Sequence, residues 1–298
     1  MISEFLLRAR NLNINTLATY GVTSSFVFLW GAAAIFTRWG LDNASPTVLL
    51  TFRFSVALIL LLIIGVFRKK LLPQKDAMKP VILTGLIMIG GYSVCYFQAM
   101  AHGVTPGLIA TIMGIQPILT LCILEQKMNK IKLLGLFVAL LGLITLVWQS
   151  LSASTIAPVG ILLALLALSC ITFGAILQKN IKQHPAEILP IQYAIGLLIC
   201  FLLLPFENIA VTINGTFIVA VLFLGILVSV VAQILFYKLL SRTSVVNVTS
   251  LFYLVPIVTA LLDYFILGNI LPWSGLVGMF AILTGIMLVF KAGANEAK

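Results

Sequence analysis

Charged residues are scarce in this chain, and so are histidine and cysteine. Of its 298 residues, 18 are Lys or Arg and 8 are Asp or Glu, so that 9% are charged whereas 61% are hydrophobic. So few charges cannot cover a water-soluble protein of this length, and lipid must therefore be part of its solvent. The four cysteines show no CxxC spacing, and His102 and His184 fall in loops predicted on opposite faces. These patterns argue against a disulfide framework, a metal site or an intramembrane catalytic centre, and we expect no cofactor.

Long apolar runs fill the chain instead. A bilayer core about 30 Å thick is crossed by roughly 20 residues of α-helix, whereas a barrel strand needs only about 10 alternating residues. The runs have the helical length. They lie at 19–37, 47–67, 80–101, 104–124, 131–149, 157–178, 187–205, 215–238, 244–267 and 272–291. The sequence therefore predicts an all-α polytopic membrane protein with ten transmembrane helices.

The basic residues fix the predicted orientation. All but two of the 18 Lys and Arg fall on one side of this arrangement, where the positive-inside rule places the cytoplasm. Arg38 lies on the other side, and Arg53 falls within the second span. Both termini are therefore expected in the cytoplasm. The net charge of +10 follows from the same asymmetry, so we expect contact with anionic lipid and not with nucleic acid.

The first half of the chain repeats in the second half. A shift of 139 positions aligns landmarks in four helices, and a shift of 143 aligns the last helix of each half. The aligned pairs include Pro46 with Pro185, Phe97 with Phe236, Pro117 with Pro256, Gly135 with Gly278 and Gly142 with Gly285. We expect a cytoplasmic segment 1–18, a five-helix repeat at 19–149, a second repeat at 157–291 and a cytoplasmic tail at 292–298.

Five spans per repeat is an odd number, so the second repeat enters the membrane from the opposite face. An inverted repeat of this kind is typical of secondary transporters, whose two halves meet at a midplane site and open it alternately to either side. A duplicated scaffold without transport is the alternative.

Short motifs in a fixed order carry a family resemblance over residues 20–290. They are Trp30-Gly31, Pro46, Phe52-Arg53, Tyr96-Phe97-Gln98-Ala99, Pro117, Leu124-Glu125, Pro256 and Leu267-Gly268-Asn269. In this order the chain resembles the drug/metabolite transporter superfamily, specifically its EamA-type ten-helix exporters. That resemblance implies export of metabolites such as amino acids from a bacterial cytoplasm, across the inner membrane, through a cavity between the halves. The Gly-Glu pair usual after helices 4 and 9 is replaced here by Leu124-Glu125 and Gly268-Asn269.

Two charged residues fall clearly within predicted spans, Arg53 and Asp263. At 1.5 Å per residue, both lie roughly 10 Å below the outer membrane boundary. A charge in the membrane must be paired or hydrated. The two side chains either are structural, reaching the headgroups or each other, or they line an outward vestibule. In the second case Arg53 would hold a substrate carboxylate and Asp263 an ammonium or a proton.

A second group of candidates is uncharged. Amides facing lipid would be expensive, so polar side chains in spans should face a cavity or a hydrogen-bonded interface. The candidate cavity residues are Trp30, Tyr92, Tyr96, Gln98, Gln116, Gln192, Gln233, Tyr237, Asn247 and Tyr253. Pro117 and Pro256 remove a backbone hydrogen bond at matching places, which predicts either a pair of hinges or two static kinks.

The hypothesis favoured by these patterns is a secondary transporter that exports small metabolites, with neutral or aromatic amino acids as the best guess. Transport would be proton-coupled or facilitative, by a monomer or a homodimer embedded in membrane lipid. A flippase for lipids or lipid-linked sugars and a multidrug efflux pump are the alternatives. An intramembrane enzyme and a channel are less favoured, because no acids converge in a span and the inverted repeat suits alternating access.

Overall fold

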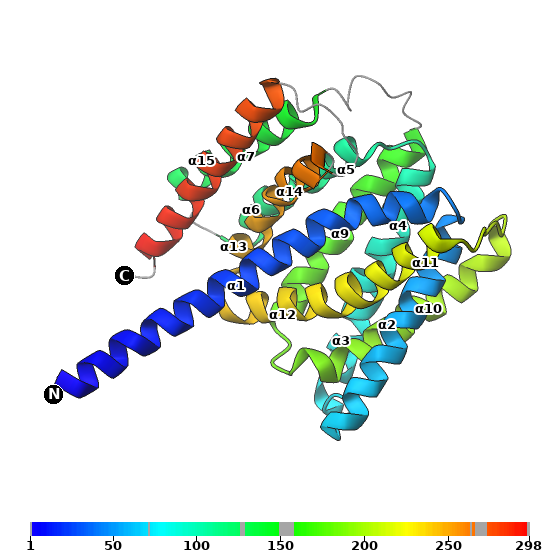
Figure 1. Ribbon diagram of the computed structural model, residues 1–298, viewed down its shortest axis with the longest axis horizontal. Helices are drawn as coiled ribbons and strands as arrows, with labels where there is room; N and C mark the ends of the chain where they lie inside the picture. The colour runs from blue at the N-terminus through cyan, green and yellow to red at the C-terminus, as the bar shows by residue number, and fades with distance from the viewer. Residues whose placement is uncertain are drawn as a thin grey trace.

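The computed structural model of the chain describes residues 2–70, 72–125, 129–148, 158–262, 264–265 and 273–296, without the side chains of 2–19, 106–107 and 294–296. Every regular element in these ranges is helical except an isolated bridge between Ala44 and Val211. The helices pack side by side in one body, from which the N-terminal part of α1 projects (Figure 1).

The elements of the two halves follow the same order. Those of the first half are α1 (Ile2–Leu41), α2 (Pro46–Arg68), η1 (Lys75–Ala77), α3 (Met78–Thr84), η2 (Gly85–Gly91), α4 (Tyr92–Ala101), α5 (Pro106–Met113), α6 (Gln116–Leu124) and α7 (Lys130–Leu146). Those of the second half are α9 (Pro158–Lys179), α10 (Pro185–Leu203), η3 (Leu204–Phe206), α11 (Gly215–Leu222), η4 (Phe223–Ala232), α12 (Gln233–Arg242), α13 (Val245–Ser250), η5 (Leu251–Tyr253), α14 (Val255–Leu262) and α15 (Trp273–Glu296).

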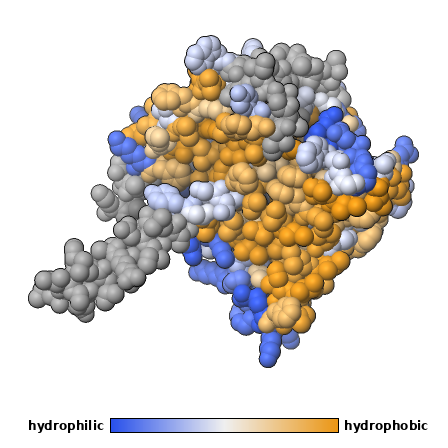
Figure 2. All heavy atoms as spheres, in the orientation of Figure 1, coloured by the Kyte–Doolittle hydropathy of each residue, from blue (hydrophilic) through white to orange (hydrophobic). Residues whose placement is uncertain are grey.

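Within the described ranges, eight helices are long and apolar enough to cross a membrane, and Leu108–Leu124 forms a shorter apolar helical stretch. Hydrophobic side chains cover much of the visible face of the body, and hydrophilic ones lie mostly at its margins (Figure 2). These helices confirm the predicted all-helical class with several helices of membrane-spanning length.

The structure places several boundaries differently from the sequence prediction. Residues 2–18 form no helix of their own, because α1 continues unbroken through them to Leu41. The predicted spans 104–124 and 244–267 are interrupted. The first is split between α5 and α6, and the second between α13, η5 and α14.

Proline explains both interruptions. Pro117 and Pro256 are each the second residue of a new helix, where a missing N–H costs nothing. If an α-helix ran through either position, it would lose one hydrogen bond, and the proline ring would clash with the carbonyl oxygen four residues earlier. The predicted kinks are therefore breaks, at Gly114–Ile115 and around Leu254, and these places are 139 residues apart.

Two π-helical segments also occupy matching places in the halves. Segment η2 joins α3 to α4, and segment η4 joins α11 to α12. A shift of 139 carries Gly85–Gly91 onto 224–230, within Phe223–Ala232. The wider i→i+5 turns of π-helix are rare and occur often at functional sites.

The body has two unlike ends. The end containing the C-terminus of α1 and the loop after α10 is poor in basic residues, and we call it the charge-poor end. There the loop 207–212 pairs with the α1–α2 connection: the backbone N–H of Ser45 donates to Ala210, and that of Thr212 donates to Asn43. The opposite, charge-rich end carries the basic residues near three helix connections: those between α2 and α3, between α9 and α10, and between α12 and α13.

At the charge-rich end, His184 caps the start of α10. Its Nδ1 accepts a hydrogen bond from the backbone N–H of Ala186. Partial burial, followed by the nearby charge of Arg68, holds the pKa of His184 below its ordinary value. The ring therefore stays neutral near pH 7 and keeps the lone pair that the cap needs.

Helices α7 and α15 form a close pair at one side of the body (Figure 1). A Cβ added at Gly135 would lie 2.6 Å from the carbonyl oxygen of Gly285, and one added at Gly142 would lie 2.7 Å from that of Gly278. The two backbones therefore touch at both places, which only glycine permits.

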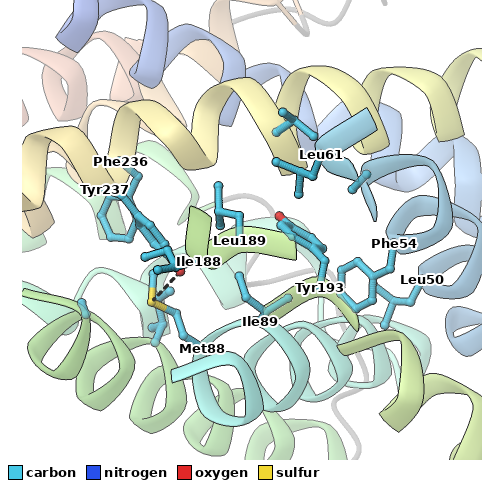
Figure 3. Packing of buried hydrophobic residues seen from close by; sticks show 14 of the residues in the cluster. Leu50, Phe54, Leu61, Met88, Ile89, Ile188, Leu189, Tyr193, Phe236 and Tyr237 are labelled. Atoms are coloured by element: carbon cyan, nitrogen blue, oxygen red, sulfur yellow. Dashed lines mark hydrogen bonds between the residues drawn. The ribbon is translucent and has the colours of Figure 1, made fainter. Parts of the chain in front are cut away.

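A core shared by both halves lies around α2, α10, α12 and η2. Phe54 and Tyr193 meet edge to face, with ring centroids 5.4 Å apart, and Ile89 and Leu189 lie beside them (Figure 3). This packing joins the two halves and leaves the cavity described next between α1, α4, α5 and α14.

Candidate functional site

A cavity of about 150 Å³ lies inside the bundle. Its walls come from both halves of the chain. The lining residues are Trp30, Ala33, Ala34, Arg53, Tyr92, Ser93, Tyr96, Phe97, Ala110, Met113, Gly114, Gln116, Ile171, Val228, Phe252, Val255, Pro256 and Thr259. Cavities of about this volume in protein interiors accept a benzene ring.

Arg53 is the charged residue in this wall. It stands seven residues after the first residue of α2, and its Nε donates to Ser229 Oγ at 2.8 Å. Its guanidinium carbon lies 5.8 Å from the ring centre of Phe54 and 5.7 Å from that of Phe97. These contacts hold the planar guanidinium group in place, and none of them neutralises its charge.

Five aromatic side chains also line the cavity: Trp30, Tyr92, Tyr96, Phe97 and Phe252. Tyr92 and Tyr96 are one turn apart on α4, and their ring centroids lie 5.6 Å apart. Trp30 and Phe252 line the same cavity, and their own ring centroids are 5.3 Å apart. A solute here would meet flat apolar surfaces, and the rings of Trp30, Tyr92 and Tyr96 each carry a polar group at one edge.

An aromatic tetrad closes the cavity toward the charge-rich end. It consists of Phe26, Trp30, Phe236 and Phe252, and each ring contacts the other three with centroids 5.2–5.7 Å apart. Phe26 and Phe236 are fully buried behind the two members that line the cavity. The cavity therefore lies between the aromatic tetrad and the charge-poor end.

Gln116 opens α6 and reaches the cavity from the helix break. Its side chain is 2% exposed, and its Nε2 has no hydrogen-bond partner among the described residues. An unpartnered buried amide donor is costly, so its presence in a cavity wall indicates a place for a ligand acceptor. The break before Pro117 is what brings this residue to the wall.

The structure brings five of the predicted cavity residues together, Trp30, Arg53, Tyr92, Tyr96 and Gln116, with Pro256 beside them. The sequence predicted these residues because amide, aromatic and charged side chains within a membrane span are unfavourable against lipid. Sequence reasoning missed the apolar part of the wall, because Met113, Val228 and Val255 resemble any other core residue.

Gln98 lies outside the cavity. Its Nε2 donates to Glu207 Oε1 at 3.0 Å, and Glu207 Oε2 accepts from the backbone N–H of Thr47 at 3.0 Å. Glu207 therefore joins the start of α2 to the end of α4 at the charge-poor end. The sequence analysis did not single out this residue, which falls just beyond a predicted span.

Gln192, Gln233 and Tyr237 also lie away from the cavity, in a buried cluster on its charge-rich side. The hydroxyl of Tyr237 donates to Gln192 Oε1 at 2.7 Å, and Gln192 Nε2 donates to Gln178 Oε1 at 3.2 Å. Gln233 is 5% exposed, and its Nε2 has no partner in the described part of the chain. We call Gln178, Gln192, Gln233 and Tyr237 the amide cluster.

The remaining predicted residues have other surroundings. The hydroxyl of Tyr253 donates to the backbone oxygen of Leu136, against α7. Asn247 donates to Thr243 at the charge-rich end. Asp263 lies outside the described residues, so no contact with Arg53 is assigned. Pro117 is buried in α6 and does not line the cavity. Among the described residues, no three His, Cys, Asp or Glu gather as a metal site requires.

The model of the EamA-like transporter family matches residues 19–148 and again 158–291. A probable amino-acid metabolite efflux pump of Salmonella typhimurium is 25% identical over 278 residues, covering 88% of this chain and 91% of that protein. An uncharacterized transporter of Bacillus subtilis is 24% identical, covering 93% of each chain. A crystal structure with 18% identity shares the fold, with a TM-score of 0.76 over 94% of this chain and 99% of that one.

Proposed function

Because the chain belongs to the EamA-like transporter family, it is a membrane transporter and not an enzyme, and we propose that it exports small metabolites by alternating access. The observation that carries this proposal is the cavity between the two halves, with one fixed guanidinium, aromatic walls and an unpartnered amide donor. The match confirms the resemblance that the sequence motifs indicated.

Neutral or aromatic amino acids and closely related metabolites are the solutes that we propose. Relatives in Salmonella typhimurium and Escherichia coli are named as probable amino-acid metabolite efflux pumps. A cavity of about 150 Å³ suits one ring or branched chain plus a small polar group better than it suits a lipid-linked sugar.

Contacts between the halves support the proposed inverted repeat of two five-helix units. The repeat pairs Gly135 with Gly278 and Gly142 with Gly285. The observed contacts are Gly135 with Gly285 and Gly142 with Gly278, and a two-fold axis exchanges each contact with the other. The matching proline breaks and π-helical segments agree with this symmetry. We propose that both termini lie in the cytoplasm of a cell whose inner membrane holds the protein, so that the charge-poor end faces outward.

The inverted repeat also suggests where the opposite-facing cavity forms. The repeat carries Arg53 onto Gln192 and Gln98 onto Tyr237, both in the amide cluster, which is closed in this structure. If the halves exchange conformations, this cluster becomes the wall of a cavity at the charge-rich end. The unpartnered donor of Gln233 would then meet water or solute.

Thiol labelling tests this exchange in a cysteine-free version of the chain. We expect Ala34→Cys, in the cavity wall, to react with an impermeant reagent from the charge-poor side. Gln233→Cys should react from the charge-rich side, and faster while solute is being transported. Leu189→Cys, fully buried in the core, is the unreactive control. Transport that continues while Gln233→Cys never reacts would show that the opposite cavity forms elsewhere.

Filling the cavity tests the site itself. Ala34→Phe places a ring in the cavity, and we expect uptake of labelled solutes into proteoliposomes to fall by about tenfold or more, because even about 1.4 kcal/mol of lost binding is tenfold. Leu162→Phe adds a ring on an exposed apolar face and should leave uptake unchanged. The panel includes amino acids, their derivatives, drugs and lipids, with and without a pH gradient. Equal uptake by both variants would remove the cavity from the transport path.

A further inference from the structure

We propose that the transported solute is a carboxylate that carries no ammonium group, such as a deaminated or N-acylated derivative of an aromatic or branched amino acid. This inference rests on the proposed export function and names the charge state of its solute. Among the proposed solutes, it selects the metabolites related to amino acids that are anions near neutral pH over the amino acids themselves.

The first support is the charge of the cavity. Arg53 gives its wall one positive charge, and none of the described lining residues is acidic. The ionisable groups that face Arg53 from the packed helices are the hydroxyls of Tyr92, Tyr96 and Tyr193 and the thiol of Cys200. A bound monoanion would neutralise the guanidinium, whereas a zwitterion would bring a second cation into a site that has no described carboxylate to receive it.

The second support is the geometry of the guanidinium. The Nε of Arg53 donates a hydrogen bond to Ser229, and the structure shows no hydrogen bond from the two terminal nitrogens of Arg53 to a described residue. The rings of Phe54 and Phe97 flank the planar group. A guanidinium that is fixed at Nε and has two terminal nitrogens available can donate one hydrogen bond to each oxygen of a carboxylate.

The third support is Gln116. Its unpartnered Nε2 is a donor, so it calls for an acceptor on the solute. The oxygen of a 2-oxo, 2-hydroxy or N-acyl group supplies one, whereas an ammonium supplies only more donors. Cation–π contact with Trp30 or Tyr92 would recover only part of what an ammonium loses on leaving water.

The experiment compares three solutes that share one phenyl ring and differ in the charged groups that they carry: phenyllactate, an anion; phenylalanine, a zwitterion; and phenethylamine, a cation. Binding is measured by calorimetry on the full chain in lipid nanodiscs, and transport is measured in proteoliposomes.

We expect phenyllactate to bind at least about tenfold more tightly than phenylalanine, and phenethylamine to bind more weakly than either. Arg53→Gln, which introduces the residue found at the repeat-related position, should abolish this preference. Arg53→Lys should keep part of it, and Ser229→Ala should reduce it. Phenylalanine binding as tightly as phenyllactate would overturn the inference and leave export standing. Transport of no solute in the wider panel would instead remove the proposed function.

Discussion

Replacement of Gly285 by leucine is expected to separate α15 from α7 and to lower the melting temperature of the protein by about 5 °C. An added Cβ would meet the carbonyl oxygen of Gly135 and would lie 2.5 Å from the backbone nitrogen of Ala139. Neither is the end of a flexible side chain, so a helix must move. Overpacking of this kind costs about 3 kcal/mol, which corresponds to roughly 5 °C for a chain of this size.

Met287→Leu is the matched control, because Met287 lies on the same helix and is exposed. Its melting temperature should be that of the wild-type protein. Helices α7 and α15 contribute no residue to the described wall of the cavity, so the folded fraction of Gly285→Leu should bind solute with unchanged affinity. Identical melting of both variants would contradict backbone contact between the two helices.

The second large effect is expected at Glu125. Its carboxylate accepts a hydrogen bond from the ammonium of Lys132, which is only 2% exposed. Glu125→Gln removes the countercharge of a buried cation, and loss of one partner of a buried pair costs about 3–5 kcal/mol. We expect a lower melting temperature that added salt does not mimic, because buried pairs are screened little.

A double variant separates the pair from its surroundings. Glu125→Leu with Lys132→Met removes both charges and should recover most of the stability lost in Glu125→Gln. The matched control is Lys70→Gln. Its Nζ lies 3.8 Å from Glu187, and its side chain is 69% exposed, so we expect a loss below about 1 kcal/mol. Equal losses in Glu125→Gln and Lys70→Gln would show that the buried pair does not stabilise the fold.

The sequence predicted the all-helical class because each apolar run is long enough to leave few alternatives in a membrane. It also placed Pro117 and Pro256 at sites of helix distortion for the right reason, since a proline interrupts the helical hydrogen bonds, and each of them lies at the start of a new helix. The π-helical segments had no such signal, since GLIMIGG reads as ordinary apolar helix. Their position depends on which hydrogen bonds neighbouring helices permit.

The candidate site was predicted in part. A polar side chain within a span must face a cavity or form a hydrogen bond with another side chain. The sequence does not show which of these two surroundings it has. Arg53 and Gln116 face the cavity, whereas Gln98 has Glu207 and Gln192 has Tyr237 as partners. Which alternative holds depends on residues more than 40 positions away, and this information is absent from any local pattern.

The π-helical segments have a consequence for the length of the chain. A π-helical turn holds more residues than an α-helical one, so η2 behaves as an insertion that α-helix would not need. Deleting one residue from 85–91 would let this stretch return to α-helix, and the helix beyond it would keep nearly the same orientation, because the π-helical turns had absorbed the extra residue. Tyr92 and Tyr96 would then stay in the cavity wall. The same deletion in a stretch that remains α-helical would turn everything beyond it by about 100° around the helix axis. An alignment gap of one residue within 85–91 is therefore compatible with an unchanged solute site, whereas a gap elsewhere in α3 or α4 reports a change in it.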